Sequence, residues 1–111
     1  MAQVIYGNTF SGGSIQVPPS KSAAHRQVLC AALSRGRCSV SNVDMNEDIK
    51  ATVAAVTALG VQACYDDASS LLTLDASGLG GQNAVIDCGE SGSTLRFLIP
   101  IAAALGVSAR F

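Results

Sequence analysis

The stretch Val17-Pro18-Pro19-Ser20-Lys21-Ser22-Ala23-Ala24-His25-Arg26 decides how the first part of this chain folds. Two prolines end an extended run, because proline lacks the N–H that a strand or a helix interior needs. Ser20 is a favoured N-cap residue, so it predicts a helix from Lys21 to about Ser34. Free backbone N–H groups at this helix start, with the cationic side chains of Lys21 and Arg26, favour a bound anion.

The rest of the chain alternates strand-like and helix-like segments. Further helices are expected over about 47–59 and 93–105, with Asn46 as a cap and Gly60 and Gly106 as stops. Pro100 lies inside the last of these, which predicts a kink there or a late helix start. Short strands are expected near residues 4–6, 14–17, 38–41, 61–65, 71–74 and 84–87.

A weak internal repeat supports an α/β fold class. Thr57-Ala58-Leu59-Gly60-Val61-Gln62-Ala63 is similar to Ala103-Ala104-Leu105-Gly106-Val107-Ser108-Ala109, and Cys30–Gly36 is a looser copy. Each copy has the pattern of a helix end, a glycine stop and a new strand. Residues 66–70 are expected to form a hairpin turn. No internal domain boundary is predicted.

Composition narrows the classes of function. The 111 residues are 49% hydrophobic, with seven Lys and Arg against eight Asp and Glu, so no basic stripe suits nucleic acid. No apolar run reaches the length of a membrane span, and no signal peptide opens the chain. Four cysteines without a C-x-x-C pair, and a single histidine, argue against zinc. We interpret the cysteines as buried, reduced thiols of a cytoplasmic protein.

A second motif, Asp87-Cys88-Gly89-Glu90-Ser91-Gly92-Ser93-Thr94-Leu95-Arg96, combines glycines, hydroxyls and an arginine at another helix start. Glycines let a backbone approach a ligand closely, and the N–H groups that follow can surround an anion. Neither motif is a P-loop or a G-x-G-x-x-G loop. Two helix N-termini could therefore face one cleft.

Three blocks of this chain, in order, resemble the 5-enolpyruvylshikimate-3-phosphate synthase family. They are Gly13-Ser14-Ile15 with Val17–Arg26, then Asn46-Glu47-Asp48-Ile49 with Ala51-Thr52 and Ala58-Leu59-Gly60-Val61, and then Asp87–Phe97. The resemblance implies transfer of the enolpyruvyl group of phosphoenolpyruvate to the 5-hydroxyl of shikimate 3-phosphate, with release of phosphate. It implies no metal and no organic cofactor, no nucleic acid or membrane partner, and a cytoplasmic, monomeric full-length enzyme.

The resemblance also implies roles for residues at matching positions. Lys21 would contact both substrates and be catalytic, while Ser22 and Arg26 would hold shikimate 3-phosphate. Gly92 would offer its backbone to phosphoenolpyruvate, and Arg96 would also bind substrate. Asp48 and Ser93 would support the site. Glu90 stands where many relatives have asparagine.

Full-length members of this family are much longer and have two lobes, each an inside-out α/β barrel of repeated folding units. The resemblance implies that residues 1–111 are the N-terminal part, with the first strands and an incomplete lobe. The acid/base residues would lie beyond Phe111. We therefore expect the fragment to bind substrate without turnover.

Simpler interpretations and other functions compete with this one. His25 has no Ser or Asp placed for a triad, so we interpret it as a structural hydrogen-bonding residue. Glu47 and Asp48 suit helix-dipole compensation, and Arg35 and Arg37 suit solvated loops. The alternatives are a UDP-N-acetylglucosamine enolpyruvyl transferase, an RNA-end-modifying enzyme and a non-catalytic binding module. The first usually has Lys-Asn in place of Lys21-Ser22.

Overall fold

The computed structural model describes residues 2–7, 11–81 and 83–111. These residues form three helices and five strands, in the order α1 (Lys21–Leu33), β1 (Arg37–Val40), α2 (Glu47–Ala58), β2 (Gln62–Asp66), β3 (Leu71–Asp75), β4 (Asn83–Val85), α3 (Gly92–Ala104) and β5 (Ser108–Arg110). The predicted α/β class is confirmed, and the predicted helix and strand limits from residue 21 onward agree to within one or two residues.

Each helix begins at a polar cap. The Ser20 hydroxyl accepts the Ala23 N–H at 3.2 Å, and the Asn46 side chain accepts the Ile49 N–H at 3.1 Å. Ser91 caps α3 in the same way, so that helix starts at Gly92 and the expectation of a late start is wrong. It continues through Pro100, whose missing N–H removes one bond from its ladder.

Three strands form an antiparallel sheet in the order β1-β3-β2. Leu72 of the central strand pairs with Val40 on one side and with Tyr65 on the other. The predicted turn at residues 66–70 does join β2 to β3 as a hairpin. Along β3 the side chains alternate in burial, with Leu72 and Leu74 fully buried, so one face of the sheet carries the core.

The strands β4 and β5 form a separate parallel pair, with α3 as the connection between them. Ala84 lies opposite Ala109 in this pair. Parallel neighbours need a crossover, and a helix is the usual one. This unit places the second motif in the loop that follows β4 and in the first turns of α3.

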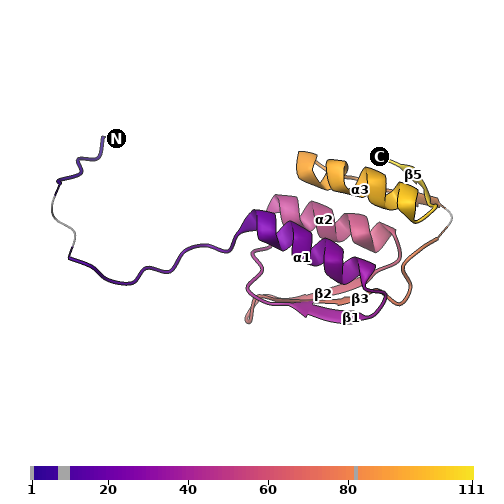
Figure 1. Cartoon of the computed structure of the whole chain (residues 1–111), viewed down its shortest axis with the longest axis horizontal. Coiled ribbons are helices and arrows are strands. Elements are labelled where there is room, and N and C mark those ends of the chain that lie inside the picture. Colours follow the sequence, from indigo (N-terminus) through magenta and orange to yellow (C-terminus); the bar gives the residue numbers. More distant parts are fainter. Residues whose placement is uncertain (1, 8–10, 82) are drawn as a thin grey trace.

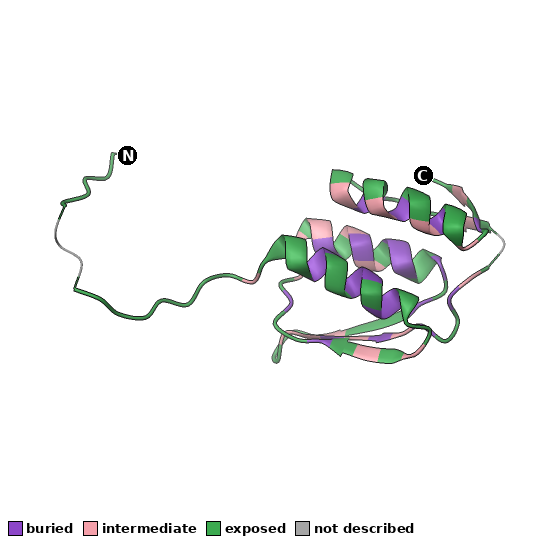
Figure 2. Cartoon of the chain, in the orientation of Figure 1, coloured by how far each residue is buried: buried purple, intermediate pink, exposed green. Residues whose placement is uncertain are grey.

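The helices α1 and α2 cover one face of the antiparallel sheet, and α3 lies on the far side of α2 beside β5 (Figure 1). The buried sides of the helices form purple stripes that face the neighbouring elements (Figure 2). Val28, Ile49 and Leu98, one from each helix, are completely buried together with Leu72 and Leu74. A single cluster of packed apolar side chains thus fixes the three helices relative to one another.

The expected strands at residues 4–6 and 14–17 are wrong. The described residues before α1 carry no regular strand and extend away from the packed helices (Figure 1). Val4, Ile5, Ile15 and Val17 are largely exposed. A strand needs a partner for its N–H and C=O groups, and a run of β-formers does not supply one.

Glycine stops end two of the helices as predicted. Gly60 and Gly106 take left-handed φ values of 99° and 69° after α2 and α3. After α1 that conformation is taken by Arg35, with φ 58°, and not by Gly36. The third, looser copy of the repeat therefore also ends its helix with a left-handed residue, but that residue is an arginine and not a glycine.

The prediction of buried cysteines is wrong for three of the four. Cys88 is buried, Cys38 is half-buried, and Cys30 and Cys64 are exposed; all four are free thiols. Apolar neighbours in sequence predicted burial, but Cys30 lies on the outer side of α1. None of the helices in the described part of the chain is long and apolar enough to span a bilayer.

Candidate functional site

The N-terminal ends of all three helices lie at the same end of the molecule (Figure 1). The contact between Lys21, at the start of α1, and Asp48, at the start of α2, brings two of these ends together. A hydrogen bond between Thr52 of α2 and Thr94, in the first turn of α3, joins the third. Free N–H groups and the positive ends of three helix dipoles therefore converge on one region.

A cleft of about 250 Å³ opens between α1 and α3 in this region. Its lining consists of Lys21, Ser22, His25, Arg26, Ser93, Arg96 and Phe97. Five of these are residues that the sequence singled out, although they are separated by as many as 75 positions. Three cationic side chains in one small cleft give it a charge that suits an anion.

Lys21 forms an ion pair with Asp48, with 2.5 Å between Nζ and Oδ2. The hydrogen bond from Lys21 is the main cause that lowers the pKa of Asp48, and a hydrogen bond from Ser91 lowers it slightly further. The side chain of Lys21 is 56% exposed, so the pair is open to solvent and to a competing anion. Asp48 itself lies beside the cleft and not in its lining.

Arg26 is held in place from two sides. Its Nη1 donates to the Ser22 carbonyl oxygen at 3.0 Å and also to the Ser22 hydroxyl. Its guanidinium lies over the Phe97 ring, 5.7 Å from the centroid. A guanidinium carries five N–H donors, so this anchoring leaves donors available for a ligand.

The start of α3 supplies the opposite wall. Ser93 and Arg96 line the cleft, and within the described part of the chain the Arg96 guanidinium forms no hydrogen bond or ion pair. Gly92 precedes them as the first residue of α3 and is not part of the lining. A Cβ built at Gly92 would have no described atom within 4 Å, which leaves its backbone open to a ligand.

A buried chain of hydrogen bonds connects the three helices behind the cleft. His25 Nδ1 lies 2.7 Å from Thr52 Oγ1, Thr52 Oγ1 lies 2.8 Å from Thr94 Oγ1, and Thr94 Oγ1 lies 2.7 Å from Ser91 Oγ. The interpretation of His25 as a structural hydrogen-bonding residue agrees with this chain. Thr52 and Thr94 lie in the blocks that carry the resemblance, but sequence reasoning gave neither of them a role, because a threonine within an apolar helical stretch is also consistent with packing.

Burial is the main cause that lowers the pKa of His25, and the charges of Lys21 and Arg26 act in the same direction. Only Asp48 opposes them. The ring is therefore held neutral near pH 7, and two cations lie in front of it. His25 donates or accepts through its ring nitrogens without adding a fourth positive charge.

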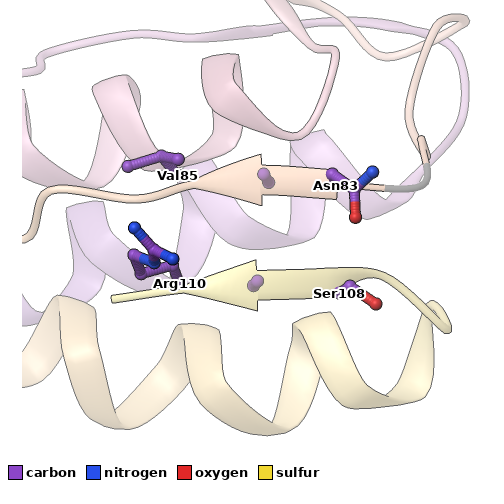
Figure 3. Close-up of a pocket in the computed structure, with 6 residues that line it drawn as sticks. Asn83, Val85, Ser108 and Arg110 are labelled. Atoms are coloured by element: carbon purple, nitrogen blue, oxygen red, sulfur yellow. The ribbon is translucent and has the colours of Figure 1, made fainter.

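Larger hollows elsewhere do not gather the predicted residues. One of about 680 Å³ lies over β4 and β5, where Val85 lies beside Arg110 and Asn83 beside Ser108 (Figure 3). Another, of about 520 Å³, carries the acidic side chains of Glu47, Asp48, Asp87 and Glu90, which would repel an anion. Among the described residues, no group of His, Cys, Asp and Glu side chains is arranged to hold a metal ion.

Comparisons with known proteins give one consistent result. The sequence profile of the family described as EPSP synthase (3-phosphoshikimate 1-carboxyvinyltransferase) matches residues 7–110. A 3-phosphoshikimate 1-carboxyvinyltransferase of Clostridium perfringens (strain SM101 / Type A) is 43% identical over 101 residues, 91% of this chain and 24% of the relative. One of Clostridioides difficile (strain 630) is 41% identical over 118 residues, 96% of this chain and 26% of the relative. One of Clostridium kluyveri is 46% identical over 100 residues, 89% of this chain and 23% of the relative. The chain thus spans about a quarter of the length of these relatives.

Proposed function

Because this chain belongs to the EPSP synthase family, we propose that residues 1–111 are the N-terminal part of a 3-phosphoshikimate 1-carboxyvinyltransferase. The complete enzyme would transfer the enolpyruvyl group of phosphoenolpyruvate to the 5-hydroxyl of shikimate 3-phosphate and release phosphate. Residues 21–111 would form an incomplete inside-out α/β barrel lobe, with no internal domain boundary. We propose a monomeric cytoplasmic enzyme that needs no metal or organic cofactor.

The cleft between α1 and α3 is the observation that carries this proposal. Both substrates are small and carry a phosphate and a carboxylate, so holding them side by side requires fixed positive charge. Lys21, Arg26 and Arg96 provide that charge, and three helix N-termini add to it. The cleft is too small and too short of aromatic surface to suit a nucleic acid.

The proposed roles follow from the position of each group. Arg26, whose orientation is fixed by Ser22 and Phe97, would bind the phosphate of shikimate 3-phosphate together with the Ser22 hydroxyl. Lys21, which lies at the cleft entrance, would contact both substrates and act as the catalytic residue.

On the opposite wall, the Gly92 backbone and the Arg96 guanidinium would bind phosphoenolpyruvate, with Ser93 in support. Asp48 would support Lys21 through their ion pair.

In the proposed reaction these residues form no covalent bond with either substrate. The 5-hydroxyl group loses its proton and its oxygen adds to C2 of the enolpyruvyl group, while C3 gains a proton, which gives a tetrahedral intermediate. Loss of phosphate from C2 and of a proton from C3 then restores the double bond. Fixed cations stabilise the anionic groups that both substrates bring together, and this is the task of the described cleft.

A direct test titrates the 111-residue chain with shikimate 3-phosphate and follows backbone amides by NMR. We expect shifts at residues 19–26 and 89–96. Lys21→Ala should weaken binding about tenfold or more, because a charge-assisted contact is lost. Lys50→Ala is the matched control, since Lys50 is paired with Glu47 and lies outside the cleft.

UDP-N-acetylglucosamine serves as the comparator ligand. Preferential binding of this nucleotide sugar would favour the sibling transferase, and binding of neither ligand would favour a non-catalytic module. Mixed with both proposed substrates, the fragment should release no phosphate, because the cleft is open on one side and cannot exclude water. Turnover near that of a full-length relative would overturn this part of the proposal.

A further inference from the structure

The chain of hydrogen bonds behind the cleft is the feature that the proposed function does not use. It runs from His25 on α1 through Thr52 on α2 to Thr94 and Ser91 at the start of α3. Each oxygen–oxygen or nitrogen–oxygen distance is between 2.7 and 2.8 Å. Thr52 and Thr94 are completely buried, and His25 is 3% exposed.

A buried chain of hydrogen bonds lowers the stability of a protein unless every polar group in it has a partner. A buried hydroxyl without a partner destabilises a protein, whereas an apolar side chain of the same shape would be nearly neutral. No buried side-chain nitrogen or oxygen among the described residues is left without a partner. Valine at both threonine positions would pack in a similar way but would leave Nδ1 of the buried His25 without its partner, so the hydroxyls supply something that packing does not.

What they supply is fixed geometry at two helix starts. His25 is one residue from Arg26 on one wall of the cleft, and Thr94 is one residue from Ser93 on the other. Hydrogen bonds have narrow distance and angle requirements, whereas apolar contacts allow sliding. This chain of hydrogen bonds therefore determines how far Arg26 lies from Ser93 and Arg96.

The direction of the protons in this chain of hydrogen bonds depends on the group to which Ser91 donates. Ser91 Oγ already accepts the Thr94 N–H, and its hydroxyl lines the same hollow as the Asp48 carboxylate, which can only accept. If Ser91 donates to Asp48, then Thr94 donates to Ser91 and Thr52 donates to Thr94. His25 must then donate to Thr52 through a protonated Nδ1, with Nε2 unprotonated.

We propose that His25, as the Nδ1–H tautomer, is a positioning residue that fixes the start of α3 against α1 through Thr52, Thr94 and Ser91. The inference rests on the proposed function only in that the cleft so fixed is the binding site for shikimate 3-phosphate. Its first consequence concerns the ligand-free chain and needs no substrate.

The first experiment records the ¹⁵N shifts of the His25 ring in the ligand-free chain near pH 8, where the ring is neutral. Nδ1 should show the shift of a protonated nitrogen and Nε2 that of an unprotonated one. His25 is the only histidine in the sequence, so the assignment is unambiguous. The opposite tautomer would overturn the proposal, because the chain would then run towards His25.

The second experiment compares two substitutions at Thr52. Thr52→Val keeps the shape and removes the hydroxyl, while Thr52→Ser keeps the hydroxyl and removes a methyl group. We expect Thr52→Val to shift the backbone amides of residues 92–96 on α3, and Thr52→Ser to leave them near their original positions. Shifts confined to α2, or a larger effect from serine, would indicate a packing role and overturn the proposal.

The third experiment measures the affinity for shikimate 3-phosphate. Thr52→Val, which removes the hydrogen bonds of Thr52 to both His25 and Thr94, should lower it about tenfold or more, and Thr52→Ser should restore it. His25→Asn, whose side-chain NH₂ can replace Nδ1–H, should bind better than His25→Leu. Equal affinities across these four variants would contradict the positioning role. An unmodified chain that does not bind at all would overturn the proposed function, while the tautomer and amide shifts would still test the chain of hydrogen bonds.

Discussion

Lys21 and Asp48 are joined by the shortest ion pair of the described structure, with 2.5 Å between Nζ and Oδ2. The pair links the first turns of α1 and α2 at the mouth of the cationic cleft. An incoming anion must therefore share Lys21 with a carboxylate that is already bound to it. Because both side chains reach solvent, exchange of one partner for the other is not blocked.

Asp48→Asn should strengthen binding of shikimate 3-phosphate several-fold at low salt, because one negative charge beside the cleft is removed. The gain should shrink at high salt, since exposed charges are screened. Calorimetric titration at two ionic strengths measures both effects. Glu47→Gln is the matched control: it removes the same charge from the same turn and breaks the Lys50 pair, outside the cleft lining. Weaker binding by Asp48→Asn would contradict this expectation and would mean that the support which Asp48 gives to Lys21 outweighs the repulsion by its charge.

Arg26→Lys should lower the affinity for shikimate 3-phosphate about tenfold although the charge is kept. Lysine cannot reproduce the planar fork that is held by Ser22 and packed on Phe97. Arg37→Lys, on β1 and away from the cleft, should leave the affinity unchanged. If both substitutions have the same small effect, only the charge of Arg26 matters and its fixed orientation does not.

Gly92→Ala should fold normally and be slightly more stable, by up to about 1 kcal/mol, because alanine is the better helix former. No described atom would lie within 4 Å of the new Cβ. The resemblance to this family implies that the inhibitor glyphosate competes with phosphoenolpyruvate for its site. In a full-length enzyme that contains this segment, the methyl group should raise the inhibition constant of glyphosate more than the KM for phosphoenolpyruvate, since the inhibitor is the longer molecule. Identical inhibition of both forms would remove Gly92 from the phosphoenolpyruvate pocket.

The free energy of unfolding should fall as the pH drops through 6.5. Burial holds the pKa of His25 below 6.5 in the folded chain, so between the two pKa values the unfolded chain binds more protons. Stability is therefore full above pH 6.5, falls below it and levels off once the folded ring is also protonated. Urea unfolding between about pH 5 and 8 covers this window, while the lowered pKa of Asp48 acts only below 3.8.

His25→Asn is the control for this pH dependence, because asparagine has no titrating group. The variant should lose that part of the slope between pH 5 and 8. An unchanged slope would assign the effect to other groups.

Gly60→Ala should destabilise the chain strongly. Gly60 has a left-handed φ of 99°, which costs another residue about 1–3 kcal/mol. An added Cβ would also lie 2.2 Å from the Gly78 carbonyl oxygen, so the loop before β4 would have to move. Thermal unfolding of Gly60→Ala beside Gly36→Ala, where a Cβ meets no described atom within 4 Å, separates this clash from the general effect of alanine. Equal melting temperatures for the two variants would contradict the close approach.

Local rules predicted most of the fold because its helices begin and end on local signals. Ser20 and Asn46 cap α1 and α2 at the predicted positions, and Gly60 and Gly106 end α2 and α3 as expected. The segments at 4–6 and 14–17 failed for the opposite reason: strand formation depends on a partner elsewhere, which composition does not reveal.

The candidate site also has a part that the sequence could predict and a part that it could not. Lys21, Ser22 and Arg26 could be predicted because proline, a cap and spacing along one helix place them together. The contact of Arg26 with Phe97 and the bond between Thr52 and Thr94 could not, because they join residues that are far apart in sequence. A threonine in an apolar helix is consistent with packing, and only the arrangement of three helices shows that its hydroxyl has a partner.

Pro100 lies inside α3 and weakens the connection between the first turns of this helix and the rest of it. Its ring supplies no N–H for the Arg96 carbonyl, so the helix ladder is interrupted next to a residue that lines the cleft. The first turns of α3 therefore depend on the Ser91 cap and on the buried bond between Thr94 and Thr52 more than on their connection to the rest of the helix. If that bond is removed, as in Thr52→Val, we expect the amides of these turns to exchange with solvent earlier than those of α2. One wall of the cleft could then open while the antiparallel sheet and α1 stay folded.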